Sequence, residues 1–212
     1  PEMYIYYIRD YLTAQPYFKK HGPVAEQKVI AQADLVVANS TYLANYGRKF
    51  NVNSHYVGQG CDFTIFQPQL IEQQHPLLDS IKGPIIGYVG LLTSKRLDIS
   101  LLEYLAKAKP EWSLVLVGSE DDDFKKSKLH QMPNVHFLGF QKPESLSEFI
   151  YGFDICINPQ VLNQMSIGNY PRKIDEYLAM GKPVVATETD AMEVFRDFVK
   201  LAKTHQDYIE CI

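Results

Sequence analysis

The chain has 212 residues, of which 46% are hydrophobic and 22% charged, and its formal net charge is −4. These proportions are typical of a soluble globular protein and exclude a disordered tail, a collagen-like fibre and a disulfide-dense mini-protein. The excess of acidic groups gives no support to a nucleic-acid partner, and no apolar stretch reaches the roughly 18 residues that span a bilayer.

The first part of the chain, residues 1–66, has the pattern of a partial α/β segment. Short apolar runs at 35–38 and 55–58 predict two strands, and two or three helices fit in the rest of the segment. Two strands are too few for an independent sheet, so we expect this segment to be the end of a larger N-terminal domain. The polar, proline-bearing stretch that follows predicts a linker over residues 67–82.

From residue 83 onward, short apolar runs alternate with helical stretches. The runs that predict strands are 85–89, 113–117, 135–138, 154–157, 183–187 and 198–202. Several are nearly continuous in apolar residues, as in strands buried on both faces of a parallel sheet. Alternation of strand and helix favours right-handed βαβ units, so residues 83–212 are predicted to form a Rossmann-like, doubly wound parallel α/β sheet.

Local signals place the helices between these strands. Residues 98–108 have apolar side chains at helical spacing, and Asp98 is the expected N-cap. Ser145 and Glu148 have the spacing of a capping box. Gly181, shortly before a proline, predicts a helix stop.

The residues that follow the strands are the candidates for ligand binding, because ligands of open α/β sheets bind outside the carboxyl ends of the strands. Gly90 and a basic pair, Lys95 and Arg96, follow the strand at 85–89. Glycine permits close backbone approach, and the cations suit an anion.

A second candidate region is the helix expected near residue 171, where Pro171 suits the first turn. Lys173 and Glu176 share one face of this helix, near N–H groups that can bind phosphate. They suit a ligand with a diphosphate and a ribose diol. The alternative is a solvated ion pair worth a few tenths of a kcal/mol.

Other motifs are incomplete or absent. The G-x-G at 58–60 lacks the third glycine of the dinucleotide fingerprint, and no Walker, G-x-S-x-G or H-E-x-x-H motif occurs. The D-x-D at 121–123 is expected to start a solvated helix rather than to bind a metal. Cys61, Cys156 and Cys211 form no C-x-x-C pair, so we expect buried, reduced thiols and a cytoplasmic protein.

Three consecutive stretches carry a family resemblance: GYVGLLTSKRLDISLLEYLAKAKPEWSLVLVG, NVHFLGFQKPESLSEFIYGFDICINP and PRKIDEYLAMGKPVVAT. Together they resemble the C-terminal domain of GT-B glycosyltransferases, most of all the bacterial members of the large retaining group called group 1, or family 4. Upstream, ADLVVANS and HYVGQGCDFTIFQP resemble the end of the N-terminal domain of that family and the linker after it. The resemblance covers roughly residues 33–195.

The resemblance implies a set of donor-binding residues. Lys95 matches the lysine of the family's phosphate-binding loop, Gly90 its loop glycine, and Glu176 the carboxylate that holds the ribose. Lys173 falls where many bacterial members have a lysine, and Phe140 falls where the backbone meets the base.

Two positions depart from the family pattern. The usual arginine after the loop glycine is Leu91, and the first of two family glutamates falls on Gly168, with Asn169 as its substitute. The family's catalytic histidine and acceptor loops belong to the first half of the N-terminal domain, which we expect to lie outside this chain. The catalytic residues are therefore unknown.

The expected function is that of a fragment, inactive alone, of a retaining glycosyltransferase of bacterial polysaccharide synthesis. Such an enzyme transfers a sugar from a nucleoside-diphosphate-sugar to a glycan or lipid-linked acceptor, with no cofactor and no metal, and with a peripheral membrane contact through the missing N-terminal part. One alternative is a GT-B nucleotide-sugar epimerase, whose acid–base groups are not identifiable here. The other is a non-catalytic module that binds a nucleotide-sugar or a partner. Sugar, base, acceptor, linkage and oligomeric state stay open.

Overall fold

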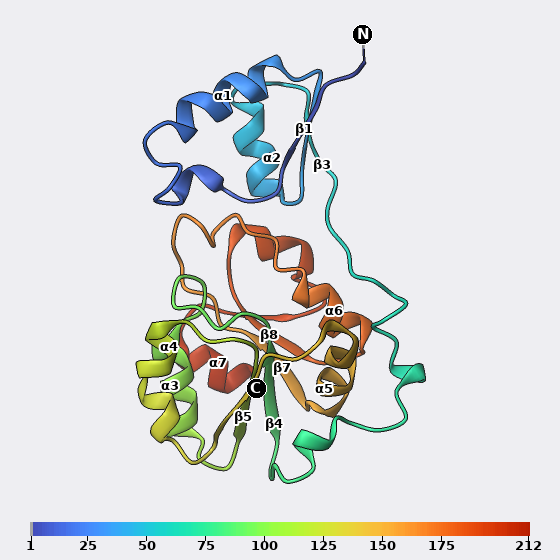
Figure 1. The fold of residues 1–212 in the computed structure, drawn as a ribbon, viewed down its shortest axis with the longest axis vertical. Helices are drawn as coiled ribbons and strands as arrows, with labels where there is room; N and C mark the ends of the chain where they lie inside the picture. Colours follow the sequence, from blue (N-terminus) through green and yellow to red (C-terminus); the bar gives the residue numbers. More distant parts are fainter. Residues whose placement is uncertain (1) are drawn as a thin grey trace. The chain divides into compact units, whose positions relative to one another are not determined.

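The computed structural model describes residues 2–212, and its largest feature is a six-stranded parallel sheet (Figure 1). Its strands are β4 (Ile85–Val89), β5 (Ser113–Val117), β6 (Val135–Gly139), β7 (Ile155–Asn158), β8 (Val184–Thr187) and β9 (Lys200–Ala202). They lie in the order β6-β5-β4-β7-β8-β9. This is the Rossmann order, in which the direction of winding reverses between the first and fourth strands, here β4 and β7. The predicted doubly wound α/β fold is confirmed.

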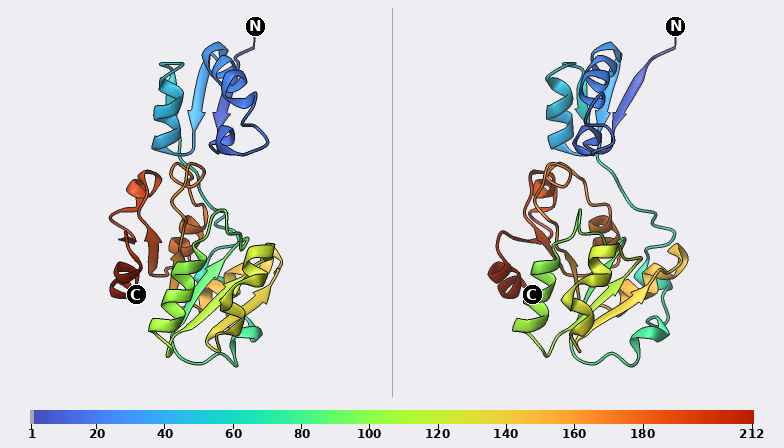
Figure 2. Two further views of the ribbon diagram at one scale, coloured as in Figure 1. Left: turned by 90° about the vertical axis from the view of Figure 1, so that its left-hand side faces the viewer. Right: turned by 60° about the vertical axis from the view of Figure 1, so that its left-hand side comes forward.

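Helices cover both faces of this sheet (Figures 1 and 2). They are α3 (Ile99–Ala108), α4 (Asp122–Lys126), α5 (Leu146–Gly152), α6 (Lys173–Ala179) and α7 (His205–Cys211). Side chains of α3, α4 and α7 share one core cluster with the strands. On the other face, α6 reaches β4 through the Tyr177 hydroxyl, which accepts a hydrogen bond from the Val89 N–H at 2.9 Å.

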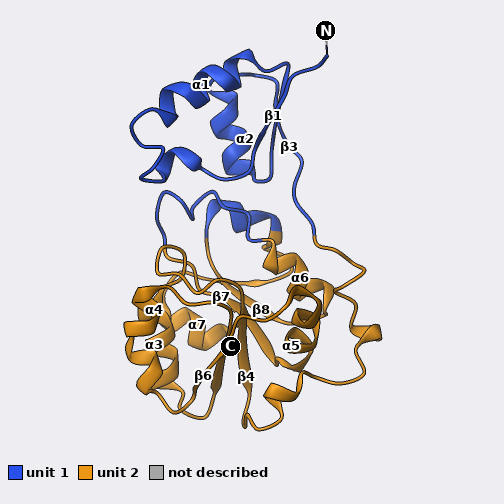
Figure 3. Cartoon of the chain, viewed as in Figure 1, with its two compact units in different colours: residues 1–60, 162–171, 189–194 blue, residues 61–161, 172–188, 195–212 orange. Residues whose placement is uncertain are grey.

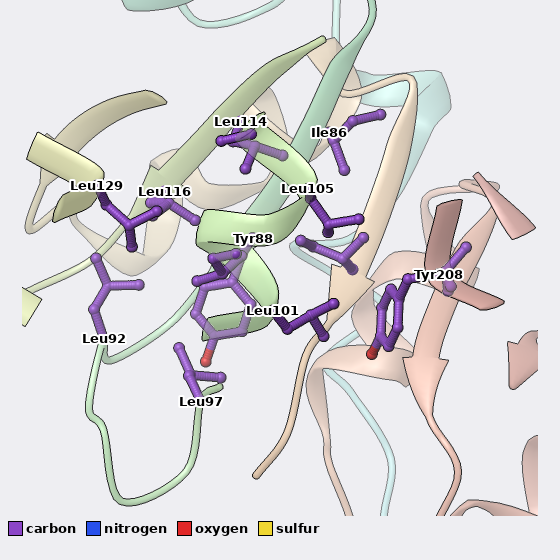
Figure 4. Close-up of a cluster of buried hydrophobic side chains, with 14 of the residues drawn as sticks. Ile86, Tyr88, Leu92, Leu97, Leu101, Leu105, Leu114, Leu116, Leu129 and Tyr208 are labelled. Carbon is purple, nitrogen blue, oxygen red and sulfur yellow. The ribbon is translucent and has the colours of Figure 1, made fainter. Parts of the chain in front are cut away.

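The main core fills the space between the sheet and α3 (Figure 4). Ile86 and Tyr88 of β4 alternate toward this side and meet Leu101 and Leu105, which are one helical turn apart on α3. Their alternation is the period of a strand, and the leucine spacing is that of a helix. Asp98 caps α3 by accepting a hydrogen bond from the Leu101 N–H, as predicted.

A smaller three-stranded parallel sheet lies in the first part of the chain. It has the order β1-β2-β3, with β1 (Ile5–Ile8), β2 (Leu35–Ala38) and β3 (Ser54–Tyr56), and two helices accompany it, α1 (Gly22–Gln32) and α2 (Thr41–Arg48). Only the second and third of these strands were predicted from the sequence. The first strand was not predictable, because IYYI has no alternation of polar and apolar residues and three of its four residues are exposed or half-buried.

Contacts group the chain into two compact units (Figure 3). Unit 1 contains the described residues up to Gly60 together with 162–171 and 189–194, and unit 2 contains 61–161, 172–188 and 195–212. The chain therefore passes between the units several times. The division into segments 1–66, 67–82 and 83–212 stays a prediction.

Two local expectations fail for identifiable reasons. The capping box at Ser145 and Glu148 is wrong: residues Pro143–Ser145 form a 3₁₀ turn, and the Ser145 hydroxyl donates to the Lys142 carbonyl instead of capping α5. Pro171 precedes α6 rather than opening it, because Arg172 is the N-cap. A capping box is present at Thr204, before α7.

Further 3₁₀ turns connect the elements. They span Leu12–Ala14, Pro68–Leu70, Pro76–Leu78, Lys128–Gln131 and Asp190–Phe195. Within residues 2–212, no helix combines the length and the apolar character needed to cross a membrane.

Candidate functional site

The candidate site lies at the carboxyl ends of the strands of unit 2. Gly90, Gly118 and Gly139 stand at the ends of β4, β5 and β6, each with a positive φ (142°, 149° and 65°). A Cβ on Gly118 would lie 1.9 Å from the Gly90 carbonyl oxygen. Only glycine allows the loops after β4 and β5 to approach so closely.

An open cavity of about 340 Å³ borders these loops. Its lining includes Gly90, Gly118, Phe140, Pro143 and Leu146 and is mostly apolar. Phe140 is 71% exposed, so its ring is available to a ligand. The size and the apolar lining suit a flat heterocycle, since small-molecule pockets occupy about 300–1,000 Å³. Two predicted donor-binding residues, Gly90 and Phe140, share this cavity.

Lys173, the first residue of α6, lies beside the loop glycine after β4. Its Nζ is 4.9 Å from the centre of the Tyr88 ring, and its Cε would lie 3.3 Å from a Cβ on Gly90. The Tyr88 ring is buried, so it supports the lysine stem and attracts the ammonium. The fold therefore brings the Lys173 ammonium and Gly90 together, although 83 positions separate them in the sequence.

Glu176 lies in the first turn of α6 and is only 8% exposed. Its Oε1 accepts a hydrogen bond from Nε of Arg172 at 3.2 Å, one helical turn away. The alternative of a solvated Lys173–Glu176 pair is not what the structure shows, because Lys173 contacts Tyr88 and Glu176 pairs with Arg172. Burial keeps this carboxylate in a fixed position, with one charged partner that is itself largely exposed.

Two further groups at this edge of unit 2 were not among the predicted site residues. The Cys61 thiol lies close to the first turn of α6: burial, Asp175 and Glu176 together raise its pKa. Asn158 ends β7 and is fully buried, and among residues 2–212 neither its side-chain nitrogen nor its side-chain oxygen has a hydrogen-bond partner. Buried amides normally have hydrogen-bond partners. The Asn158 amide is therefore a candidate ligand-binding group, located at the point where strand order reverses. Its position after an apolar run was the only sequence signal.

Lys95 belongs to a loop that the D-x-D segment holds in place. The Asp121 carboxylate accepts hydrogen bonds from the N–H and the hydroxyl of Ser94, and it also caps α4. The expectation that this segment starts a helix is confirmed. Across residues 2–212, no three His, Cys, Asp or Glu side chains form a group that could hold a metal ion.

Asn169 and Gly168 belong to unit 1, whereas the other predicted residues belong to unit 2. The Gly168 carbonyl accepts a hydrogen bond from the Ser40 hydroxyl at 2.7 Å. A Cβ on Gly168 would lie 2.2 Å from the Tyr42 ring. A side chain at position 168 would therefore require the Tyr42 ring to move. The role of Asn169 in donor binding stays a prediction.

Comparison with known proteins agrees with this fold. The sequence model of the family described as glycosyl transferases group 1 matches residues 83–207. TuaH of Bacillus subtilis (strain 168), whose name describes a teichuronic acid biosynthesis glycosyltransferase, is 28% identical over 169 residues, which are 77% of this chain and 42% of TuaH.

Among solved structures, Anabaena HepE in complex with UDP and glucose has a TM-score of 0.75 at 21% identity, covering 97% of this chain and 60% of HepE. WaaG, a glycosyltransferase involved in lipopolysaccharide biosynthesis, has a TM-score of 0.73 at 16% identity, covering 100% of this chain and 65% of WaaG. These TM-scores establish a shared fold. The chain spans less than two thirds of the length of all three proteins.

Proposed function

Because the chain belongs to the glycosyl transferases group 1 family, we propose that its six-stranded unit binds the nucleotide part of a nucleoside-diphosphate-sugar donor. The observation that carries this proposal is the juxtaposition of Lys173 with Gly90 at the border of an apolar cavity. The cavity receives the base beside Phe140. Glu176 accepts hydrogen bonds from the ribose diol, and Lys173 meets the diphosphate.

The reaction we propose is transfer of the donor sugar to a glycan or lipid-linked acceptor in the cytoplasm. The bond between the anomeric carbon and the diphosphate oxygen breaks, and the diphosphate leaves with the electron pair. An acceptor hydroxyl oxygen bonds to the anomeric carbon with retention of configuration, and its proton ends in solvent. Lys173 and Lys95 stabilise the charge that develops on the leaving group, so no metal ion is needed for this task.

The names of similar proteins support the proposed donor and the proposed reaction. HepE binds UDP and glucose in its crystal structure, and the name of TuaH refers to polysaccharide synthesis. We further propose that residues 1–212 alone transfer nothing, because the chain spans only 42% of TuaH and 60% of HepE.

A non-catalytic donor-binding module is the second candidate function. Two observations favour it: Leu91 stands where the family resemblance implies an arginine and is 63% exposed, and a side chain at Gly168 would clash with the Tyr42 ring as it stands. Both functions require nucleotide binding. They differ in turnover, which the full-length protein would show by releasing nucleoside diphosphate when an acceptor is added.

Calorimetry on the 212-residue chain tests the proposed site. We expect heat of binding with uridine or guanosine diphosphate at millimolar concentration. Lys173→Ala should weaken binding of the diphosphate roughly 10- to 100-fold, since a hydrogen bond to a charged group is worth roughly 1.5–3 kcal/mol. The same change should leave binding of the nucleoside alone unchanged. Lys107→Ala, an exposed lysine on α3, is the control. No heat with either diphosphate, or equal losses for nucleotide and nucleoside, would overturn the assignment.

A further inference from the structure

The side chain of Tyr208, on α7, reaches the carboxyl ends of β7 and β8 through the main core. Its ring packs in that core and is 2% exposed (Figure 4). Its hydroxyl donates a hydrogen bond to the Asn158 carbonyl at 2.9 Å and lies 2.9 Å from the Thr187 hydroxyl. The Thr187 hydroxyl accepts in turn from the Gln160 N–H at 2.9 Å. These four groups form one hydrogen-bonded chain, here called the Tyr208 relay.

The direction of each hydrogen bond in the Tyr208 relay follows from the chemistry of its groups. A carbonyl oxygen cannot donate, so the Tyr208 hydroxyl uses its only proton on Asn158. Thr187 must then donate to Tyr208, while it accepts from the Gln160 N–H. All the donors therefore point along the chain toward Asn158, and aligned hydrogen bonds of this kind strengthen one another in a low-dielectric interior.

The Tyr208 relay ends on residues 158–161, and these are bonded to residues 96–98, which directly follow Lys95. Two backbone hydrogen bonds of 2.9 Å join the two segments, from the Asp98 N–H to the Pro159 carbonyl and from the Val161 N–H to the Arg96 carbonyl. All these residues belong to unit 2. A hydroxyl on the last helix of the chain thus acts on the backbone beside Lys95.

We infer that Tyr208 is a positioning residue: the Tyr208 relay holds residues 158–161, and these hold the loop that carries Lys95. Only the assignment of Lys95 to the donor diphosphate rests on the proposed function. Without the Tyr208 hydroxyl, a buried carbonyl loses its donor, and the backbone around it opens more often. The Lys95 ammonium then spends less time where a diphosphate can meet it.

Hydrogen exchange of the 212-residue chain, followed residue by residue by NMR, tests whether the Tyr208 relay holds the loop. In Tyr208→Phe, exchange at the Asp98 and Val161 N–H groups should rise several-fold relative to exchange at the Leu114 N–H. Leu114 lies in β5, where its N–H is bonded to the Asn134 carbonyl, and it reports on global opening. An equal rise at all three N–H groups would mean that Tyr208 only stabilises the fold, and it would overturn the inference.

Tyr104→Phe is the matched control for the docking of α7. The Tyr104 hydroxyl on α3 donates to Oε1 of Gln206 on α7 at 3.0 Å, so its loss weakens the contact between the helices but spares the Tyr208 relay. This variant should leave the ratio of exchange rates at the wild-type value. The same rise in Tyr104→Phe as in Tyr208→Phe would assign the effect to helix docking and refute the positioning role.

A pair of variants at Thr187 tests the Tyr208 relay from β8. Thr187→Val keeps the shape of the side chain and removes the hydroxyl, whereas Thr187→Ser keeps the hydroxyl. Thr187→Val should reproduce the exchange ratio of Tyr208→Phe, and Thr187→Ser should restore that of the wild type. A wild-type ratio in Thr187→Val would overturn the inference.

Calorimetry on the same variants measures the consequence for the donor site. Binding of uridine or guanosine diphosphate should weaken several-fold in Tyr208→Phe and Thr187→Val, but not in Tyr104→Phe, and binding of the nucleoside should not change. Unchanged diphosphate affinity in variants with faster local exchange would refute the positioning role. If the wild-type chain binds neither diphosphate, the donor site is refuted, and the exchange ratios alone decide whether the Tyr208 relay holds the loop.

Discussion

Glu176→Ala is expected to lower the affinity for a nucleoside diphosphate at least tenfold while leaving the fold intact. Glu176 is 8% exposed, and its carboxylate stands in the first turn of α6. Hydrogen bonds from a ribose diol to this charged acceptor would contribute about 1.5–3 kcal/mol. At about 1.4 kcal/mol per factor of ten, the loss is roughly 10- to 100-fold in affinity.

The structural cost of the same change is much smaller. The hydrogen bond that Glu176 makes in the protein is with Arg172, whose side chain is 57% exposed and remains hydrated when the carboxylate is removed. Ion pairs of this i,i+4 type contribute about 0.3–0.5 kcal/mol to stability. Binding and stability therefore respond to Glu176→Ala on different scales, and this difference separates a ligand-binding role from a structural one.

The assay pairs calorimetry with denaturant unfolding on the same samples. The matched control is Glu210→Ala on α7, where Glu210 accepts a hydrogen bond from Gln206 at 3.1 Å, also one turn away. Glu210→Ala should leave nucleotide affinity unchanged. Glu176→Gln, which keeps an acceptor oxygen but no charge, should fall between the wild type and Glu176→Ala. Wild-type affinity in a well-folded Glu176→Ala protein would refute the ribose assignment.

Three further predictions concern stability and titration. Tyr177→Phe should lower the free energy of unfolding by about 1–3 kcal/mol in denaturant titrations, because the buried Val89 N–H loses its acceptor. Burial raises the pKa of Glu26 in the folded protein above its ordinary value of 4.5. The protonated carboxyl therefore contributes fully to stability below pH 4.5, and this contribution is lost as the pH rises through the higher pKa of the folded state. Glu26→Gln should therefore flatten the fall of melting temperature with pH; an unchanged slope would contradict this. Removing a neighbouring carboxylate with Glu176→Gln should lower the raised pKa of Cys61, and a faster reaction with a thiol reagent at pH 8 would show it.

The main sheet was predictable because its strands are short apolar runs with clear ends. Every residue of β4 and β5 is buried. Strands that are buried on both faces appear in a sequence as continuous hydrophobic segments. Ile5–Ile8 was not predictable in this way, since it is mostly exposed and aromatic. The failed cap at Ser145 has a local cause as well: Pro143 begins a 3₁₀ turn that leads directly into the helix.

The candidate site was predictable only in part. Gly90 directly follows β4, and Lys173 begins the helix that comes after β7, so their approach to the same edge of the sheet could be expected from topology. The pairing of Glu176 with Arg172 could not be predicted from the sequence. Lys173 and Arg172 lie three and four positions before Glu176, so both are possible partners, and tertiary contacts decide between them. Cys61 and α6 are far apart in the sequence, so no local pattern could predict that the Cys61 thiol lies close to this helix.

The contact between Tyr42 and Gly168 has a consequence for how this family diversifies. A side chain at position 168 and an aromatic ring at position 42 compete for the same space, because a Cβ would lie 2.2 Å from that ring. The two positions should therefore covary among related chains: glycine at 168 should accompany the aromatic residue, and glutamate at 168 should accompany a small residue at 42. A lineage could exchange one arrangement for the other only by changing both, and either single change would pass through an overpacked or an underpacked intermediate.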